Sequence, residues 1–165
     1  MKLWKDLISG DEMCSDAYPH QELYDGVCLE VRARYTTKGN DQIMIAADDE
    51  IDDDEGGETV VDVVDSFKLN EIQMSKKEFM GYCKGIMPRI CKKLTENGKE
   101  DRIPAFKAGA TEMVKFIISK IDEFQFFTGP SFDMDAGLAF CYQKNQEDDG
   151  PTFLFFLDNM SEMKL

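Results

Sequence analysis

The chain has 165 residues, which is enough for one domain with a hydrophobic core, and hydrophobic residues make up 42% of it. Its formal net charge of −14 argues against nucleic-acid binding, which requires a basic face to displace counterions from phosphate. No apolar run approaches the roughly 20 residues that span a bilayer, and Asp6 interrupts the N-terminus before a secretory signal could form. These features predict a soluble, cytoplasmic protein.

Residues 1–35 predict short strands and turns. Within them, residues 27–34 alternate in the manner of a half-buried strand that follows an Asp25-Gly26 turn. Residues 36–58 differ, because acidic residues crowd together there and no Lys or Arg occurs between Lys38 and Lys68. Like charges at this density repel and cannot pack, so the composition predicts a long mobile loop.

The β-branched run of residues 59–65 predicts a strand, which residues 67–69 extend. Two amphipathic helices then form an antiparallel hairpin over residues 75–124. Ser75 and Glu78 have the spacing of a capping box, and Asn97-Gly98 ends the first helix.

Two prolines bear on the helices of this hairpin. Pro88 lies inside the first apolar stripe and is expected to kink or split that helix. Pro104 suits the first turn of the second helix.

The remaining residues return to strands at 138–142 and 152–157, joined by a turn at 148–151. Strands, a helical hairpin and further strands predict an α+β fold. We expect a single domain, residues 1–165. Its β body comprises residues 1–35, 59–72 and 125–165, and the hairpin is inserted into that body.

Charge is divided unevenly along the chain. Residues 75–124 carry a net +4, which leaves −18 on the remainder. Such a division favours steering toward protein partners, although it is equally typical of a solvated helix pair beside an acidic loop. The candidate contacts for an acidic partner on the first helix are Lys84, Arg89, Lys92 and Lys93. Their alternative role is the ordinary polar face of an amphipathic helix.

The cysteines and the histidine form no catalytic or zinc-binding motif. Five cysteines, at positions 14, 28, 83, 91 and 141, form no Cys-x-x-Cys pair, so neither a zinc ribbon nor a thioredoxin-type motif is present. We expect reduced, mostly structural thiols. His20 is the only histidine, and nothing marks a catalytic partner for it.

The acidic run offers hard oxygen ligands for calcium. Its candidate ligands are Asp48, Asp49, Glu50, Asp52, Asp53, Asp54 and Glu55. The run lacks the spacing of an EF-hand loop, so the expected affinity is weak, about 10⁻⁴ to 10⁻³ M. The alternative is a solvated loop with no ligand. We expect no tightly bound cofactor.

Four strings resemble translationally controlled tumour proteins, in the right order along the whole chain. These strings are Asp6-Leu7-Ile8-Ser9-Gly10-Asp11-Glu12-Met13-Cys14-Ser15-Asp16, Phe124-Gln125-Phe126-Phe127-Thr128-Gly129, Asp135-Ala136-Gly137-Leu138, and Phe155-Phe156 with Glu162-Met163. Four departures from the family pattern stand out. The acidic loop holds no serine from Ala46 to Ile51, and Pro130 replaces a glutamate. Pro88 lies in a helix that the family usually keeps free of proline, and Leu165 stands where many members end on cysteine.

The resemblance implies a β-tent similar to that of an exchange factor for Rab GTPases, with an inserted helical hairpin. It implies a protein that binds other proteins: small GTPases, translation elongation factors or microtubules, with weak calcium binding. We expect a monomer. Asp11 and Glu12 lie in the first string, and Glu12 matches the family position implicated in GTPase contact. The alternative is that Ser9 or Asp11 caps a short helical turn there.

A second function class stays open from the sequence. The tent that the resemblance implies is similar to that of methionine sulfoxide reductase B, so a thiol-dependent enzyme of that type is the alternative. Its chemistry needs an accessible cysteine of low pKa, and only Cys14 falls outside an apolar stretch.

Overall fold

The computed structural model describes residues 1–37 and 58–165, and it confirms the α+β class. Its strands are β1 (Lys2–Asp6), β2 (Glu12–Ser15), β3 (His20–Leu23), β4 (Cys28–Arg32), β5 (Tyr35–Thr37), β6 (Thr59–Val61), β7 (Asn70–Ile72), β8 (Gln125–Thr128), β9 (Ala139–Tyr142), β10 (Thr152–Phe156) and β11 (Met160–Lys164). Its α-helices are α2 (Asp62–Phe67), α3 (Lys76–Glu96) and α4 (Ile103–Ser119). Short 3₁₀ turns are η2 (Glu100–Arg102), η3 (Ile121–Glu123) and η4 (Leu157–Asn159).

The body is built on a six-stranded sheet of order β3-β4-β10-β9-β8-β7, with a three-stranded sheet of order β11-β1-β2 beside it. Every residue of β10 is buried, because a separate core lies on each face of that strand. Leu154 and Phe156 belong to the larger core, which the body shares with the helices. Phe153 and Phe155 belong to a second core, which lies under the three-stranded sheet. This alternation follows from the two-residue period of a strand.

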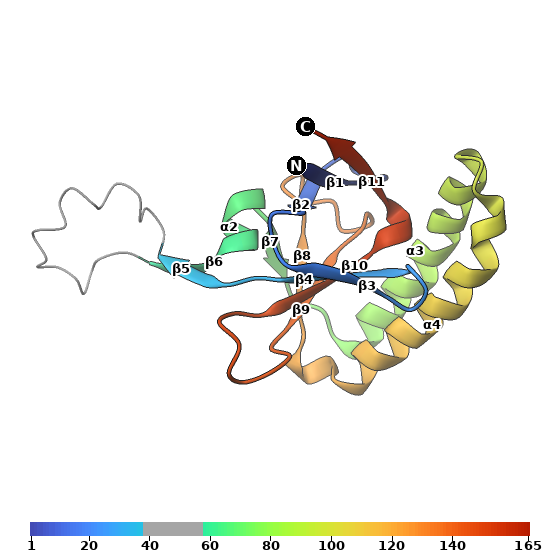
Figure 1. Ribbon diagram of the computed structural model, residues 1–165. Helices are drawn as coiled ribbons and strands as arrows, with labels where there is room; N and C mark the ends of the chain where they lie inside the picture. Colours follow the sequence, from blue (N-terminus) through green and yellow to red (C-terminus); the bar gives the residue numbers. More distant parts are fainter. Residues whose placement is uncertain (38–57) are drawn as a thin grey trace, which may run out of the picture.

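Helices α3 and α4 lie side by side as a hairpin, which packs against one face of the body (Figure 1). The predicted capping box is confirmed: the Glu78 amide donates to Ser75 Oγ at 3.1 Å, and the Ser75 amide donates to Glu78 Oε1 at 2.8 Å. Phe79 and Phe106 are fully buried and anchor the two helices in the larger core. Asn97 ends α3, and Pro104 lies in the first turn of α4, as predicted.

Pro88 does not split the first helix, which runs unbroken through it. The proline lacks the amide that would bond the carbonyl of Lys84, four residues earlier. Because Pro88 is exposed, that carbonyl is not forced into an apolar environment. Ile86 and Ile90 are buried on either side and hold the flanking turns on the core.

The strand predicted over residues 59–65, with its extension to residue 69, is wrong in its second half. Only Thr59–Val61 form a strand, and α2 follows directly. Val60, Val63, Val64 and Phe67 also have helical spacing, and burial of Val63 against the second core outweighs the strand preference of valine.

The loop expected over residues 36–58 is wrong at its first two residues. Thr36 and Thr37 belong to β5, which pairs with β6 in a two-stranded ribbon. Residues 38–57 of the expected loop lie outside the described residues. At the other end of the chain, β11 pairs with β1 over five residues, which brings the two termini together (Figure 1).

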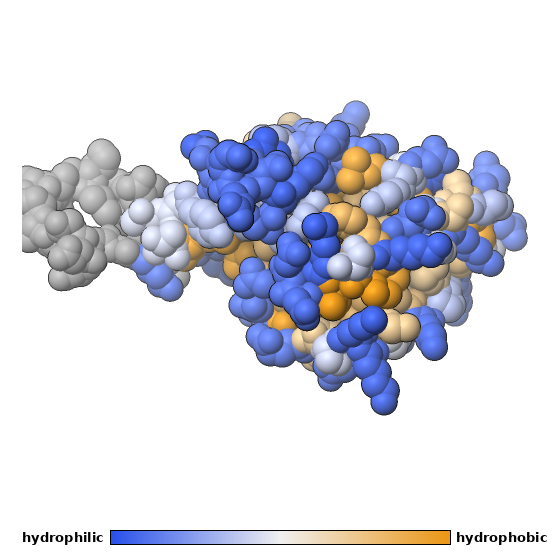
Figure 2. Space-filling model, turned by 90° about the horizontal axis from the view of Figure 1, so that it is seen from below, coloured by the Kyte–Doolittle hydropathy of each residue, from blue (hydrophilic) through white to orange (hydrophobic). Residues whose placement is uncertain are grey.

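Figure 2 shows the molecule from below, with hydrophobic surface exposed among hydrophilic side chains. Partly buried apolar residues of α4 and of the turn after it pack on the larger core, among them Val114, Phe116 and Ile121. Over residues 1–37 and 58–165, no helix is long and apolar enough to cross a bilayer.

Candidate protein-binding surfaces

The Asp11-Glu12 pair lies where the chain leaves β1, turns, and enters β2. Ser9 Oγ donates to Asp6 at 2.6 Å and accepts from the Asp11 amide at 3.2 Å, which closes the turn. Ser9 therefore stabilises a turn between strands, and no helix is present there for it to cap. The sequence match around these residues thus coincides with a specific hydrogen-bonded corner.

The two acids of this corner have different environments. Asp11 is half-buried, and its Oδ2 accepts from Ser131 Oγ at 2.7 Å and from the Ser131 amide at 3.2 Å. Glu12 is exposed, and among the described residues its carboxylate makes no hydrogen bond or ion pair. Asp11 therefore stabilises the fold through its contact with Ser131, while the Glu12 carboxylate is accessible to a partner.

A hollow of about 380 Å³ lies beside Glu12. It is lined by Gly10, Asp11, Glu12, Ser66, Phe67, Lys68 and Pro130. Four separate segments contribute these residues: the β1–β2 turn, the start of β2, the end of α2 and the loop after β8. The hollow joins the free carboxylate to a small apolar surface, a combination that suits a protein contact.

The buried carboxylate of Asp6 stabilises the same corner. Its carboxylate accepts from the Ser9 hydroxyl, from the Gly137 amide at 3.2 Å and from Asn159 Nδ2. Burial raises the pKa of Asp6 above its ordinary value, and the hydrogen bonds from Ser9 and Gly137 oppose that rise. Asp6 thus connects β1, the loop after β8 and η4.

The four basic candidates on α3 do not act alike. Lys84 and Lys92 are exposed and, within the described residues, make no ion pair. Arg89 donates to the backbone oxygen of Asp135 at 2.9 Å, and Lys93 lies 4.0 Å from Glu96. Only Lys84 and Lys92 are therefore wholly free to meet an acidic surface.

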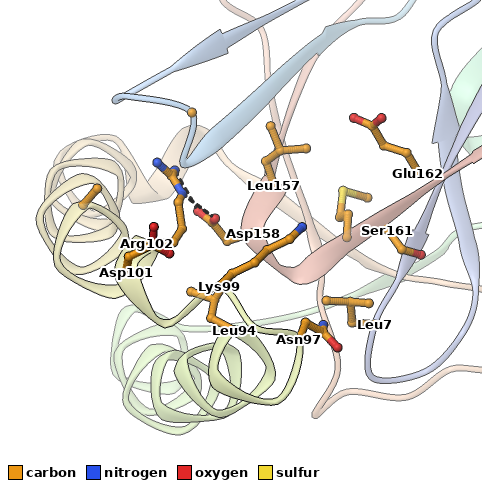
Figure 3. Close-up of a pocket in the computed structure, with 13 residues that line it drawn as sticks. Leu7, Leu94, Asn97, Lys99, Asp101, Arg102, Leu157, Asp158, Ser161 and Glu162 are labelled. Atoms are coloured by element: carbon orange, nitrogen blue, oxygen red, sulfur yellow. Dashed lines mark hydrogen bonds and ion pairs between the residues drawn. The ribbon is translucent and has the colours of Figure 1, made fainter.

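Sequence reasoning missed a groove of about 730 Å³ between the hairpin tip and the body. Figure 3 shows Leu7, Leu94 and Leu157 around it, with Lys99 extending across it from the tip. Arg102 closes one end, because its Nε and Nη2 donate to the two carboxylate oxygens of Asp158 at 2.8 and 3.1 Å.

The same Arg102 guanidinium reaches the body at a second point, where it donates to the backbone oxygen of Asp25 at 2.9 Å. The hydrogen bond to Asp158 raises the pKa of Arg102. Asp158 lies 56 positions away, so no local motif could have indicated this pair.

The cysteines do not fit the thiol-enzyme alternative. All five are free, and all but the half-buried Cys91 are buried, including Cys14, which the sequence had left outside the apolar stretches. Burial raises the pKa of Cys28, Cys83 and Cys141 to about 12 and that of Cys14 also above its ordinary value. These four buried side chains are thiols at neutral pH, whereas sulfoxide reduction requires a thiolate.

His20 and the acidic run add no assigned site. His20 Nδ1 lies 2.8 Å from the backbone oxygen of Tyr18, and its ring packs edge-on against Trp4. The candidate calcium ligands, residues 48–55, lie outside the described residues. Within residues 1–37 and 58–165, no group of three or more His, Cys, Asp or Glu could hold a metal ion.

The family of this chain follows from its match over nearly its full length. Residues 1–161 match the model of the family described as translationally controlled tumour protein. The chain belongs to this family. Among translationally controlled tumour proteins, it is similar to the homologue of Plasmodium yoelii yoelii, at 39% identity over 172 residues covering 99% of each chain. It is also similar to homologue 1 of Dictyostelium discoideum, at 38% identity over 175 residues, again with 99% of each covered.

A solved member of the family shows the same fold. The structure of the translationally controlled tumour-associated protein p23fyp from Schizosaccharomyces pombe superposes with a TM-score of 0.82, at 34% identity and with all of both chains covered. The β-tent with an inserted helical hairpin is thereby confirmed. The methionine sulfoxide reductase alternative has no support among these relatives.

Proposed function

We propose that this member of the translationally controlled tumour protein family regulates other proteins by binding them through two oppositely charged surfaces, and that it has no catalytic centre. The acidic surface is the corner that carries Glu12, and its proposed partner is a small GTPase. The basic surface is the outer face of α3, and its proposed partner is an acidic surface on an elongation factor or on tubulin.

The observation that carries the proposal is the difference between the contacts of Asp11 and those of Glu12. Ser131 donates to Asp11, so the corner is fixed. Glu12 lines a hollow of about 380 Å³ beside it and has no ion-pair or hydrogen-bond partner within residues 1–37 and 58–165. A free carboxylate at a rigid corner can compete with phosphate for a lysine of the GTPase, or occupy its magnesium position, without first giving up an internal contact.

Support for the second surface comes from charge. Lys84 and Lys92 are exposed on one helix of a segment that carries +4 in a chain of net −14. An exposed charged surface chiefly accelerates association, so its contribution falls as salt rises.

The test uses two variants that leave internal contacts intact. Glu12→Lys should weaken binding of a purified Rab-class GTPase by about 30-fold or more, which corresponds to about 2 kcal/mol, and should leave binding of tubulin unchanged. The double variant Lys84→Ala/Lys92→Ala should do the reverse, with a loss of tubulin binding that shrinks as salt is raised. If Glu12→Lys lowers the melting temperature as much as it lowers binding, the residue is structural and the proposal is wrong.

Weak calcium binding by Asp48 to Glu55 remains a separate proposal. It rests on the number of carboxylates in that run and on the family resemblance. Calorimetry with Asp52, Asp53 and Asp54 changed to Asn should show a loss of the weak isotherm. An isotherm that these changes leave intact would assign calcium to another part of the chain.

A further inference from the structure

The loop between β8 and β9 exposes two large apolar side chains next to the acidic corner. Phe132 is 53% exposed and Met134 is 45% exposed. Among the described residues, the other exposed large hydrophobic side chains are Met1 and Leu165 at the chain ends, Tyr35 in β5 and Met80 on α3. Within the described residues, Phe132 and Met134 are thus the only two exposed large apolar side chains that lie close together in the sequence, and neither lies at a chain end.

Phe132 also has an unfavourable backbone conformation. Its φ is +59°, in the left-handed region, where a bulky residue with a Cβ is destabilised by roughly 1–2 kcal/mol. Glycine would adopt this conformation without the penalty. A phenylalanine that is both strained and exposed contributes little to folding, which points to a role outside the fold.

The loop is nevertheless held firmly. On one side Ser131 donates to Asp11, and on the other Tyr82 Oη donates to the backbone oxygen of Ala136 at 2.6 Å. Arg89 donates to the backbone oxygen of Asp135 at 2.9 Å, and within the loop the Asp135 amide donates to Asp133 Oδ1, also at 2.9 Å. A partner that meets such a preorganised loop loses little conformational entropy in ordering it.

Acidic residues neighbour this apolar pair in the sequence and line the adjacent hollow. Asp133 and Asp135 flank Met134 in the sequence, and Glu12 shares its hollow with Pro130, two residues before Phe132. In the described part of the chain none of these three carboxylates has an ion-pair partner. The complement of an apolar centre with an acidic rim is an apolar pocket with a basic rim.

We propose that Phe132 and Met134 are the apolar anchors with which the Glu12 corner holds a folded protein partner, whose matching surface is an apolar pocket rimmed by Lys and Arg. The inference rests on the proposed function, since it assigns the binding energy of that same surface. Glu12 then supplies the charged contact that orients the partner, while Phe132 supplies the apolar contact, as aromatic anchors do at protein interfaces.

The experiment measures binding of a purified Rab-class GTPase by calorimetry, with unfolding followed in parallel. Phe132→Gly removes the anchor and relieves the left-handed strain, so we expect affinity to fall at least about 30-fold, with the melting temperature unchanged or higher. Met134→Ser should weaken binding by about 5- to 10-fold. Asp25→Gly is the matched control, because Asp25 is exposed, also has a φ of +59°, and lies in the β3–β4 turn. It should leave affinity unchanged.

The outcomes separate this inference from the proposed function. If Glu12→Lys weakens the GTPase complex while Phe132→Gly does not, the anchor is wrong and the acidic corner stands. A Phe132→Gly variant that loses binding only because it unfolds at a lower temperature also overturns the inference. If the wild-type chain does not bind the GTPase at all, the proposed function fails, and the anchor assignment fails with it.

Discussion

Asp11 and Ser131 are 120 positions apart in the chain, and both the hydroxyl and the amide of Ser131 donate to the same carboxylate oxygen of Asp11. Gly129 allows this approach, because a Cβ at that position would overlap the Asp11 side chain. One acid of the Asp11-Glu12 pair thus fixes the β8–β9 loop beside β2, and the other has no partner in the described part of the chain.

The first prediction separates the two acids by stability. Asp11→Ala removes a charged acceptor from two donors of Ser131, so the free energy of unfolding should fall by about 1–2 kcal/mol. Glu12→Ala should change it by less than about 0.5 kcal/mol, since Glu12 is exposed and unpaired in the described chain. Urea unfolding of both variants measures the difference. Equal losses would mean that Glu12 also has a structural contact.

The second prediction concerns Asp6, whose carboxylate accepts from Ser9, Gly137 and Asn159. In Asp6→Asn, an amide NH₂ group replaces one carboxylate oxygen. This group faces the same hydrogen-bond donors but cannot accept from them. The free energy of unfolding should therefore fall by about 3 kcal/mol at neutral pH. A loss below about 1 kcal/mol would show that water replaces the carboxylate without cost.

The pH dependence of that loss has a defined sign. Burial raises the pKa of Asp6 in the folded state above 3.8, its value in the unfolded chain. Protonation of Asp6 therefore contributes fully to the free energy of unfolding below pH 3.8, and this contribution is lost as pH rises through the folded pKa. The difference in stability between wild type and Asp6→Asn should consequently be larger at pH 3.5 than at pH 7. Chemical unfolding at the two values gives this difference. A difference that grows with pH would mean that the pKa of Asp6 is lowered by folding.

The third prediction uses glycines on the two helices of the hairpin. A Cβ on Gly109 of α4 would lie 2.7 Å from the Tyr24 backbone oxygen and would overlap Val27, so Gly109→Ala should destabilise the fold by about 1–3 kcal/mol. On α3, a Cβ on Gly81 or Gly85 would meet no atom within 4 Å. Gly81→Ala and Gly85→Ala should each stabilise it by up to about 1 kcal/mol. Thermal unfolding of the three variants tests whether α4 packs this closely on the body.

The fourth prediction concerns the two-point contact of Arg102 with Asp158. Lysine keeps the charge but cannot donate from two nitrogens to two oxygens, so Arg102→Lys should lower the free energy of unfolding by about 1 kcal/mol. Arg102→Lys/Asp158→Asn should cost little more than the single changes, because both act on one contact. Fully additive losses would indicate that the two residues act independently.

Features set by neighbouring residues could be predicted from the sequence. The capping box of Ser75 and Glu78, the end of α3 at Asn97 and the start of α4 near Pro104 depend on interactions within one turn of helix. The helix at Asp62–Phe67 was missed, since its valines favour a strand locally and only burial against the second core decides the outcome.

The candidate surface was predicted only in part. The motif indicated Glu12, but the contacts that define its surroundings join residues far apart: Asp6 with Gly137 and Asn159, and Asp11 with Ser131. No periodicity or spacing encodes such contacts. Likewise, the strain at Phe132 arises from a backbone angle that its sequence neighbours do not dictate.

Chemical-shift mapping with isotope-labelled protein and an unlabelled Rab-class GTPase tests the central claim most directly. If the corner is the contact, the amides of Glu12, Phe132 and Met134 should shift or broaden first on titration. Those of residues 143–150, in the β9–β10 turn, and of Lys84 and Lys92 on α3 should stay unchanged. Perturbations confined to α3 or to the β9–β10 turn, with Glu12 and Phe132 unaffected, would contradict the account.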